Sequence, residues 1–290
     1  MLFFNKLTLK IHCWGGLGSQ LLALNYYLRV QEKFPTKRII LVLHTGGITS
    51  RSSEIDFLNN KINLLKVDDY QSSSSKILVK NRSSLSIFTS AKIYTKFLAN
   101  FLKFIITDDK KVLQVRSWTI SVRCTYTSNI LRKDDIVHMA NILGINTKSL
   151  EQNFLGIHYR MGDLPTLKPE SLVPFNSISA VISELINAGL IVDKVNVFSD
   201  TILNDSNLKL PDKINCEWKS VDTLQTIRDL SQAKCFIGTS SKVSLWVAIF
   251  RWALDVPGDI YLPNSIIGQF VELTNVDRND SAAVMIKTYS

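Results

Sequence analysis

The residues of this sequence best suited to chemistry are a histidine, an arginine and an aspartate that follow a short apolar run. In "NFLGIHYRMGDLP", residues 153–165, the run 154–157 predicts a strand that delivers His158, Arg160 and Asp163 into a loop. The guanidinium of Arg160 is a permanently charged fork that suits phosphate oxygens, and it can offset charge on a diphosphate leaving group without a metal. Asp163 is expected to orient the loop or the arginine. The alternative is a structural arginine–aspartate pair that closes a turn.

A second stretch, "WGGLGSQ" at residues 14–20, combines a tight turn with the start of a helix. Gly16 and Gly18 let the backbone approach a ligand, and the first N–H groups of the following helix can receive an anion. Ser19 and Gln20 add polar side chains to this turn. The stretch is not the dinucleotide fingerprint GxGxxG, because Gly18 is followed by Ser19-Gln20-Leu21 and not by a glycine at the third position, and it is not a P-loop, because no Gly-Lys-Ser/Thr follows. An ordinary glycine turn is the alternative.

Two further strand ends carry polar residues. In "GTSSKVSLW", residues 238–246, Thr239, Ser240 and Ser241 open an apolar helix after a glycine, which again predicts an anion-accepting helix N-terminus. Ordinary helix capping explains the same residues. Asp200 ends the run "FSD", where it either caps the next helix or accepts a hydrogen bond from a hydroxyl group.

Several signatures of other chemistries are missing from the sequence. No Asp-x-Asp triplet occurs, so a metal-held nucleotide is not supported, and no HExxH, HxxxH or GxSxG motif is present. We therefore expect no metal and no other cofactor. The residues do not identify a general base, and His12, Asp163 and Asp200 all qualify by their location.

The composition describes a globular protein large enough for one big domain or two of ordinary size. Hydrophobic residues make up 46% of the 290 residues and charged residues 20%. No stretch approaches the roughly 18 apolar residues of a membrane span, and the N-terminal apolar run is too short for a signal peptide. The four cysteines form no CxxC pair. We expect reduced thiols and a cytoplasmic location.

The net charge of +9 is unevenly distributed. Residues 1–150 carry 22 basic and 9 acidic side chains, a net of +13, whereas residues 151–290 carry a net of −4. The first half is therefore expected to face an anionic partner, either nucleic acid or a membrane surface. Because no RNA- or DNA-binding signature is present, nucleic acid is the less favoured partner and none is expected.

The order of predicted elements indicates an α/β fold with two doubly wound domains, residues 1–150 and 151–290, that face a cleft. In the first half we expect strands at 8–13, 37–44 and 112–118, helices at 20–34, 84–106 and 127–143, and an irregular excursion at 45–83. In the second half we expect strands at 154–160, 194–200, 234–238 and 259–263, and helices at 171–189, 221–233 and 240–254.

The order and spacing of these stretches resemble the α-1,2-fucosyltransferase family (glycosyltransferase family 11). That family shows "GGLGNQ" near the N-terminus, matched at 15–20, and "HxRRGD" at the start of its second half, matched at 158–163. It often has "FSDD", which residues 198–201 resemble, and a "DL…C…I…NSSFSWW" stretch, which residues 229–246 resemble. The four matches are collinear over roughly residues 11–250.

The resemblance implies a GT-B fold, which is two Rossmann-like domains, and metal-independent inverting transfer of fucose from GDP-fucose. Carried over by position, Arg160 would bind the donor diphosphate and act in catalysis. Residues implied to contact substrate are Gly16, Gly18, Ser19, Gln20, His158, Asp163, Asp200, Thr239, Ser240 and Ser241. Because Ser19 replaces an asparagine and Met161 an arginine of the family pattern, another nucleotide sugar on the same scaffold stays open.

The resemblance also gives the basic first half a partner. In the GT-B layout the N-terminal domain receives the acceptor, and a glycan on a lipid diphosphate at the inner face of an anionic membrane would suit the net charge of +13. The Lys- and Phe-rich segment 84–106 is either part of that contact or a core helix with a solvated lysine face. We expect a role in bacterial surface-polysaccharide synthesis. The non-enzymatic alternative is a basic α/β protein that binds RNA or a phosphorylated ligand.

Overall fold

A computed structural model describes residues 8–45, 53–67, 111–116, 119–123, 131–145, 153–161, 169–201, 208, 210, 214–276 and 286–289. The chain divides into two compact units, unit 1 (Met1–Asn129) and unit 2 (Ile130–Ser290). The predicted boundary at 150 is about twenty residues too late, because helix α4 (Lys133–Leu143) packs on helix α8 (Lys242–Ala253) of unit 2. The predicted helix at 84–106 lies outside the described residues.

The described strands of unit 1 form a five-stranded sheet in the order β3-β2-β1-β5-β4, and among them only β4 is antiparallel to its neighbour. Its elements are β1 (Thr8–Trp14), α1 (Leu17–Lys33), β2 (Arg38–His44), the 3-10 helix η2 (Asp56–Asn60), β3 (Leu64–Val67), β4 (Lys111–Arg116) and β5 (Thr119–Arg123). The expectation that residues 45–83 are irregular is wrong for η2 and β3, since β3 extends the parallel sheet beside β2.

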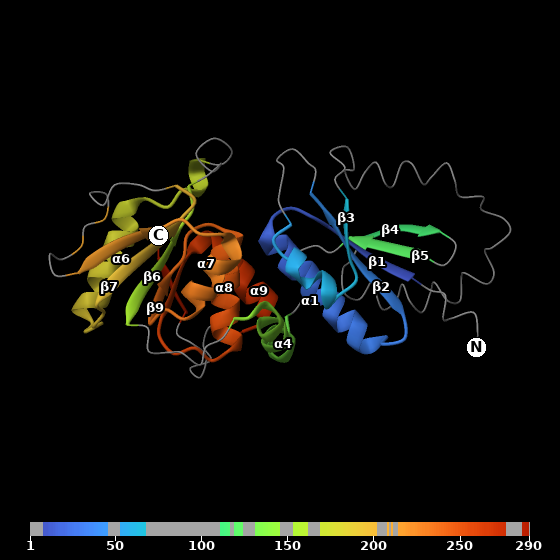
Figure 1. The fold of residues 1–290 in the computed structure, drawn as a ribbon. Helices are drawn as coiled ribbons and strands as arrows, with labels where there is room; N and C mark the ends of the chain where they lie inside the picture. The colour runs from blue at the N-terminus through green and yellow to red at the C-terminus, as the bar shows by residue number, and fades with distance from the viewer. Residues whose placement is uncertain are drawn as a thin grey trace. The chain divides into compact units, whose positions relative to one another are not determined.

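Unit 2 is built on a six-stranded, fully parallel sheet in the order β11-β10-β9-β6-β7-β8. Counted along the chain from β6, this is the 3-2-1-4-5-6 order of a doubly wound Rossmann sheet. Besides α4 and α8, its elements are β6 (Phe154–Tyr159), η3 (Pro169–Ser171), α6 (Phe175–Asn187), β7 (Lys194–Ser199), β8 (Asn215–Lys219), α7 (Thr223–Ser231), β9 (Cys235–Ile237), β10 (Ile260–Pro263), α9 (Asn264–Thr274) and β11 (Ile286–Tyr289). Figure 1 shows the strands of both units with the helices beside them.

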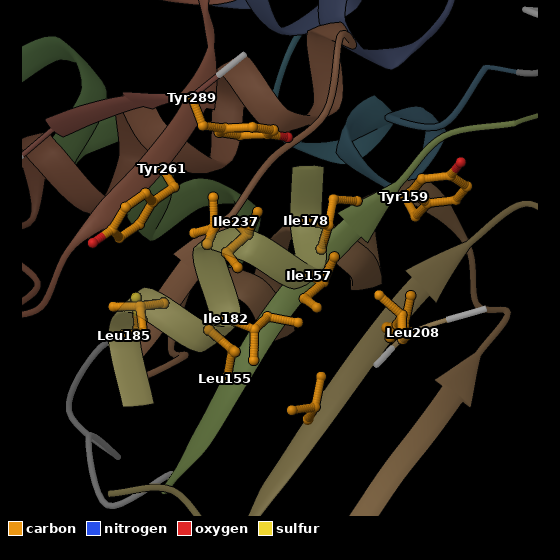
Figure 2. Close-up of a cluster of buried hydrophobic side chains, with 14 of the residues drawn as sticks. Leu155, Ile157, Tyr159, Ile178, Ile182, Leu185, Leu208, Ile237, Tyr261 and Tyr289 are labelled. Atoms are coloured by element: carbon orange, nitrogen blue, oxygen red, sulfur yellow. The ribbon is translucent and has the colours of Figure 1, made fainter. Parts of the chain in front are cut away.

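Alternating side chains of the unit 2 strands cover both faces of its sheet. Leu155 and Ile157 of β6 pack against Ile178 and Ile182 of α6 in a buried hydrophobic cluster (Figure 2). Successive strand residues point to opposite faces, so Gly156 faces the other way. There α7 comes so close that a Cβ on Gly156 would lie 2.7 Å from Leu230 Cδ2. Helices therefore cover both faces, which confirms the predicted α/β fold of doubly wound type.

The far end of α8 is fixed by a buried arginine. Arg251 is fully buried, and its guanidinium donates to the carbonyl oxygens of Ala233 at 2.5 Å and Pro257 at 3.0 Å. A buried cation is costly unless hydrogen-bonded, and burial lowers the Arg251 pKa to about 10. These bonds tie α8 to the segments before β9 and before β10. The opposite end of the helix opens at the candidate site.

Candidate anion-binding site in unit 2

The candidate site lies where the strand order of unit 2 reverses. Strand β6 is flanked by β7 on one side and β9 on the other, so the connections that follow β6 and β9 lead away in opposite directions. In open parallel sheets, ligands bind outside the carboxyl ends of the strands at this switch point. Residues 158–161 at the end of β6 and residues 238–241 after β9 therefore occupy the position at which a ligand is expected.

His158 is held by two serine hydroxyl groups at the start of α8. Its Nδ1 lies 2.8 Å from Ser244 Oγ and 3.1 Å from Ser241 Oγ. Ser244 Oγ already accepts the backbone N–H of Thr239 at 2.9 Å, so its own proton is available to Nδ1. When the Ser244 hydroxyl donates to Nδ1, that nitrogen is the acceptor and the proton of the neutral ring lies on Nε2.

Burial favours the same neutral form of His158. Only 7% of the residue is exposed, and this desolvation lowers the pKa of His158 to about 4. The charge of Asp200 opposes the shift and that of Arg160 adds to it. At neutral pH the ring is thus an uncharged hydrogen-bonding group.

The backbone of Arg160 is bonded to the loop after β9. Its N–H donates to Thr239 Oγ1 at 3.1 Å, and Thr239 is 2% exposed. Ser241 is the N-cap of α8 and accepts the N–H of Ser244 at 3.1 Å. These bonds bring Arg160 and Met161, the residues directly after β6 (below, the arginine loop), to the N-terminus of the twelve-residue helix α8. An anion at this positive end is stabilised by the helix dipole and by the N–H groups.

Gly238 allows the close approach of β9, α8 and β10. A Cβ at this position would lie 2.7 Å from Ser244 Cβ and 2.9 Å from Leu262 Cδ2. The glycine at this strand end is therefore required by packing.

The remaining predicted residues of the second half divide into three cases. Asp200 Oδ1 accepts the backbone N–H of Met161 at 3.0 Å, so its carboxylate contacts the arginine loop. Ser240 Oγ lies 2.8 Å from Ser265 Oγ at the start of α9. Asp163 lies outside the described residues. The structure thus brings Asp200 next to the loop of Arg160, and it joins Thr239 and Ser241 to β6.

The glycine turn of unit 1 follows β1 as predicted. Gly16 is the N-cap of α1, and Gly15 has a φ of 116°, a conformation that favours glycine. Gly18 is buried in the first turn of α1, and the N–H of Ser19 donates to Gly16 O at 2.9 Å. Gln20 is 2% exposed.

The side chain of Gln20 binds protein groups on both of its amide atoms. Its Nε2 donates to Gly15 O at 3.2 Å, and its Oε1 accepts the N–H of Glu54 at 3.1 Å. The amide thereby ties the turn to the segment before η2. A contact with substrate, which the family resemblance implies for Gln20, would have to compete with these two bonds.

Three aromatic rings lie together at the carboxyl ends of β1 and β2. Trp14 and His44 stack with centroids 4.1 Å apart, and His12 Nδ1 lies 2.8 Å from His44 Nε2. Burial, then the neighbouring His44 and Lys10, lower the pKa of His12 to about 3. A general base works best with a pKa near the operating pH, so His12 is a weak base in this arrangement.

Two residues of the unit 2 network were not predicted from the sequence. Ser244 is the third residue after the N-cap Ser241, and no capping rule assigns its hydroxyl to the Thr239 N–H or to His158, because the capping box has Glu or Gln at that position. Tyr289 donates from its hydroxyl to Gly238 O at 2.5 Å. No local pattern signals that contact, because it joins residues 51 positions apart.

The described part of the chain contains no group of three His, Cys, Asp or Glu side chains placed to hold a metal ion. Its described cysteines, Cys13, Cys216 and Cys235, are not in disulfides. Among the described helices, none is both long enough and apolar enough to cross a membrane.

No protein-family model matches the sequence, and no curated protein matches it. Solved structures with a loosely similar backbone include the E. coli heptosyltransferase WaaC with ADP, 11% identical, with 97% of this chain and 93% of that chain covered at a TM-score of 0.46. The E. coli ADP-heptose lps heptosyltransferase II is 11% identical, with 97% of this chain and 90% of that chain covered at a TM-score of 0.44. A glycosyl transferase family 9 structure from Veillonella parvula is 14% identical, with 89% of this chain and 81% of that chain covered at a TM-score of 0.44.

These TM-scores are below 0.5 and carry no argument about the fold. The fold is established by the strand order and the helix positions of this chain itself.

Proposed function

We propose that unit 2 binds the diphosphate of a nucleotide sugar and that the chain is a metal-independent inverting glycosyltransferase of the GT-B type. The observation that supports this most directly is the joining of two loops across the switch point. His158 at the end of β6 contacts Ser241 and Ser244, and the Arg160 N–H binds Thr239, beside the N-terminus of α8. Neutral donors, a helix dipole and a guanidinium are groups that stabilise a phosphate anion.

In the proposed reaction an acceptor hydroxyl oxygen attacks the anomeric carbon of the donor sugar. The bond from that carbon to the diphosphate breaks, and the electron pair leaves with the diphosphate. Arg160 and the first N–H groups of α8 would offset the charge that develops there, an interaction stronger in the transition state than before it. The hydroxyl proton passes to a base that the described residues do not identify.

The proposed donor is GDP-fucose, and this finer assignment is supported only by the resemblance of the four motifs. An acceptor glycan, received by unit 1 and carried on a lipid diphosphate at an anionic membrane, is proposed from the same resemblance and from the net charge of +13 over residues 1–150. A donor with another nucleotide or sugar would use the same diphosphate site.

The proposal is tested by release of nucleoside diphosphate from GDP-fucose, GDP-mannose, UDP-glucose and ADP-heptose, with glycan acceptors free or linked to a lipid diphosphate in anionic vesicles. We expect turnover with GDP-fucose, reduced at least about 100-fold in Arg160→Ala. Arg132→Ala is the matched control, because Arg132 pairs with Asp135 on α4 and its replacement removes the same charge away from the site.

Turnover with a different donor, and none with GDP-fucose, would support the glycosyltransferase activity and exclude fucose as the transferred sugar. If no donor turns over and the protein binds RNA with steep salt dependence that neither variant changes, the basic binding-protein alternative replaces the proposal.

A further inference from the structure

Tyr289, on the last described strand, contacts the backbone of the candidate site. The residue is 9% exposed, and its ring belongs to the hydrophobic cluster between α6 and the sheet (Figure 2). Its hydroxyl donates to the carbonyl oxygen of Gly238 at 2.5 Å. Burial, and then the nearby phenol of Tyr159, raise the pKa of Tyr289, so the phenol keeps its proton and remains a donor at neutral pH.

This hydrogen bond fixes one end of a peptide group whose other end is also fixed. The carbonyl of Gly238 and the N–H of Thr239 belong to the same planar peptide unit. Tyr289 binds the carbonyl, while the N–H donates to Ser244 Oγ at 2.9 Å. Because the peptide is planar, the bond from Tyr289 to its carbonyl and the bond from its N–H to Ser244 Oγ together restrict its rotation.

The same chain of hydrogen bonds continues to His158. Ser244 Oγ accepts the Thr239 N–H and lies 2.8 Å from His158 Nδ1, to which its own proton can be donated. Hydrogen bonds in such a chain polarise and strengthen one another. The orientation of one peptide thus reaches the imidazole ring at the switch point.

We propose that Tyr289 is a positioning residue for the anion site: by holding the Gly238–Thr239 peptide it sets the Ser244 hydroxyl and, through it, the tautomer that His158 presents to a nucleotide diphosphate. The ligand in this inference rests on the proposed function. The effect on the histidine ring does not.

The strand that carries Tyr289 has a separate anchor, which provides a matched control. Strand β11 pairs with β10, and Lys287 Nζ lies 3.0 Å from Asp259 Oδ2 and donates to Tyr261 OH at 3.1 Å. Tyr289→Phe removes the hydroxyl and keeps the ring in the cluster. Lys287→Met loosens the same strand without touching the Gly238–Thr239 peptide.

The experiment compares the full chain with Tyr289→Phe and Lys287→Met at a temperature well below every Tm. We measure the GDP Kd by calorimetry, the Tm, and the tautomer of His158 by ¹⁵N NMR. We expect Tyr289→Phe to weaken GDP binding about 3- to 10-fold, the effect of one lost hydrogen bond, and to reduce the Nε2-protonated tautomer. Lys287→Met should lower the Tm while leaving the Kd and the tautomer unchanged.

Equal GDP affinity in wild type and Tyr289→Phe, with an unchanged His158 spectrum, would overturn the inference and leave the proposed function intact. If the wild type binds no GDP or other nucleotide, the proposed function fails, and the tautomer alone decides whether Tyr289 positions His158. Should Tyr289→Phe not fold, Ser244→Ala releases the N–H end of the same peptide and must give the same loss of affinity. Unchanged GDP affinity in that variant would contradict the inference.

Discussion

His158 is kept neutral chiefly because burial removes its ring from water, and two hydroxyl groups face its Nδ1. The lowered pKa links this site to stability. Between a folded pKa of about 4 and the ordinary histidine value of 6.5, the unfolded chain binds a proton at this histidine that the folded protein does not. The contribution to stability is therefore complete above pH 6.5 and is lost as the pH falls toward 4.

We predict that the free energy of unfolding decreases between pH 7 and pH 5 by about 2 kcal/mol more in the wild type than in His158→Gln. The variant lacks the titrating ring, while His12, whose pKa is also lowered, titrates in both proteins and cancels. Urea denaturation at the two pH values gives this difference directly. An identical pH dependence in both proteins would show that His158 titrates normally in the folded state.

Residue types alone could predict part of this site. His158, Asp200, Thr239 and Ser241 were identifiable because polar residues at the ends of apolar runs meet at one edge of a parallel sheet. The bonds of Gln20 to Gly15 and Glu54 were not identifiable, since a glutamine after a glycine turn has the same sequence whether its amide binds protein or ligand. The role of Tyr289 was not identifiable either, because Gly238 is brought near it by the pairing of β11 with β10, which no local pattern predicts.

At the scale of elements, the loop between β9 and α8 contains a glycine that packing requires, and this loop leads directly into the N-terminus of α8. We predict that Gly238→Ala destabilises the protein by about 1–3 kcal/mol and abolishes nucleotide binding, because its Cβ would overlap Ser244 and Leu262. Gly268→Ala is the matched control. It lies on the exposed side of α9, where an added Cβ would have no atom within 4 Å, so it should stabilise by about 0.5–1 kcal/mol.

Chemical denaturation and GDP titration of the two glycine variants measure both effects. Wild-type stability and affinity in Gly238→Ala would mean that α8 can move away from β9 at little cost, and the rigid loop would then not be needed.

Elements with an uninterrupted apolar run were predictable from the sequence, including the short strands β9 and β10, whereas β3, β5, β8 and β11 were not. The apolar runs of β1, β2, β6 and β7 and the helical spacing of α1, α6 and α8 all fall within the predicted ranges, give or take a few residues. Strands β3, β8 and β11 have only four or five residues, and β8 has a polar sequence, NCEWK. Strands β3, β8 and β11 lie at the edges of their sheets, where hydrogen bonds to one neighbouring strand hold them in place although their side chains give no apolar pattern.

At the scale of the whole molecule, the two units have related architectures but different charges. Both sheets reverse their strand order beside the first strand of the unit, β1 in unit 1 and β6 in unit 2. Two α/β units were predictable from the alternation of apolar runs, whereas the boundary at 129/130 was not, because the packing of α4 on α8 is a tertiary contact. The polar network at the switch point occurs in unit 2, the less basic half.

The measurement that tests the central claim most directly is the thermal stabilisation of the protein by GDP, with UDP, ADP and CMP as comparisons, in wild type and Arg160→Ala. A ligand that binds only the folded state raises the Tm as its concentration increases, by about 2.7 kcal/mol of stability at 100 times the Kd. We predict a GDP-selective increase that is lost in Arg160→Ala. An increase selective for UDP or ADP would retain the diphosphate site and reject GDP-fucose as the donor. A wild-type Tm that no nucleotide changes would contradict the assignment of this switch point as a nucleotide-sugar site.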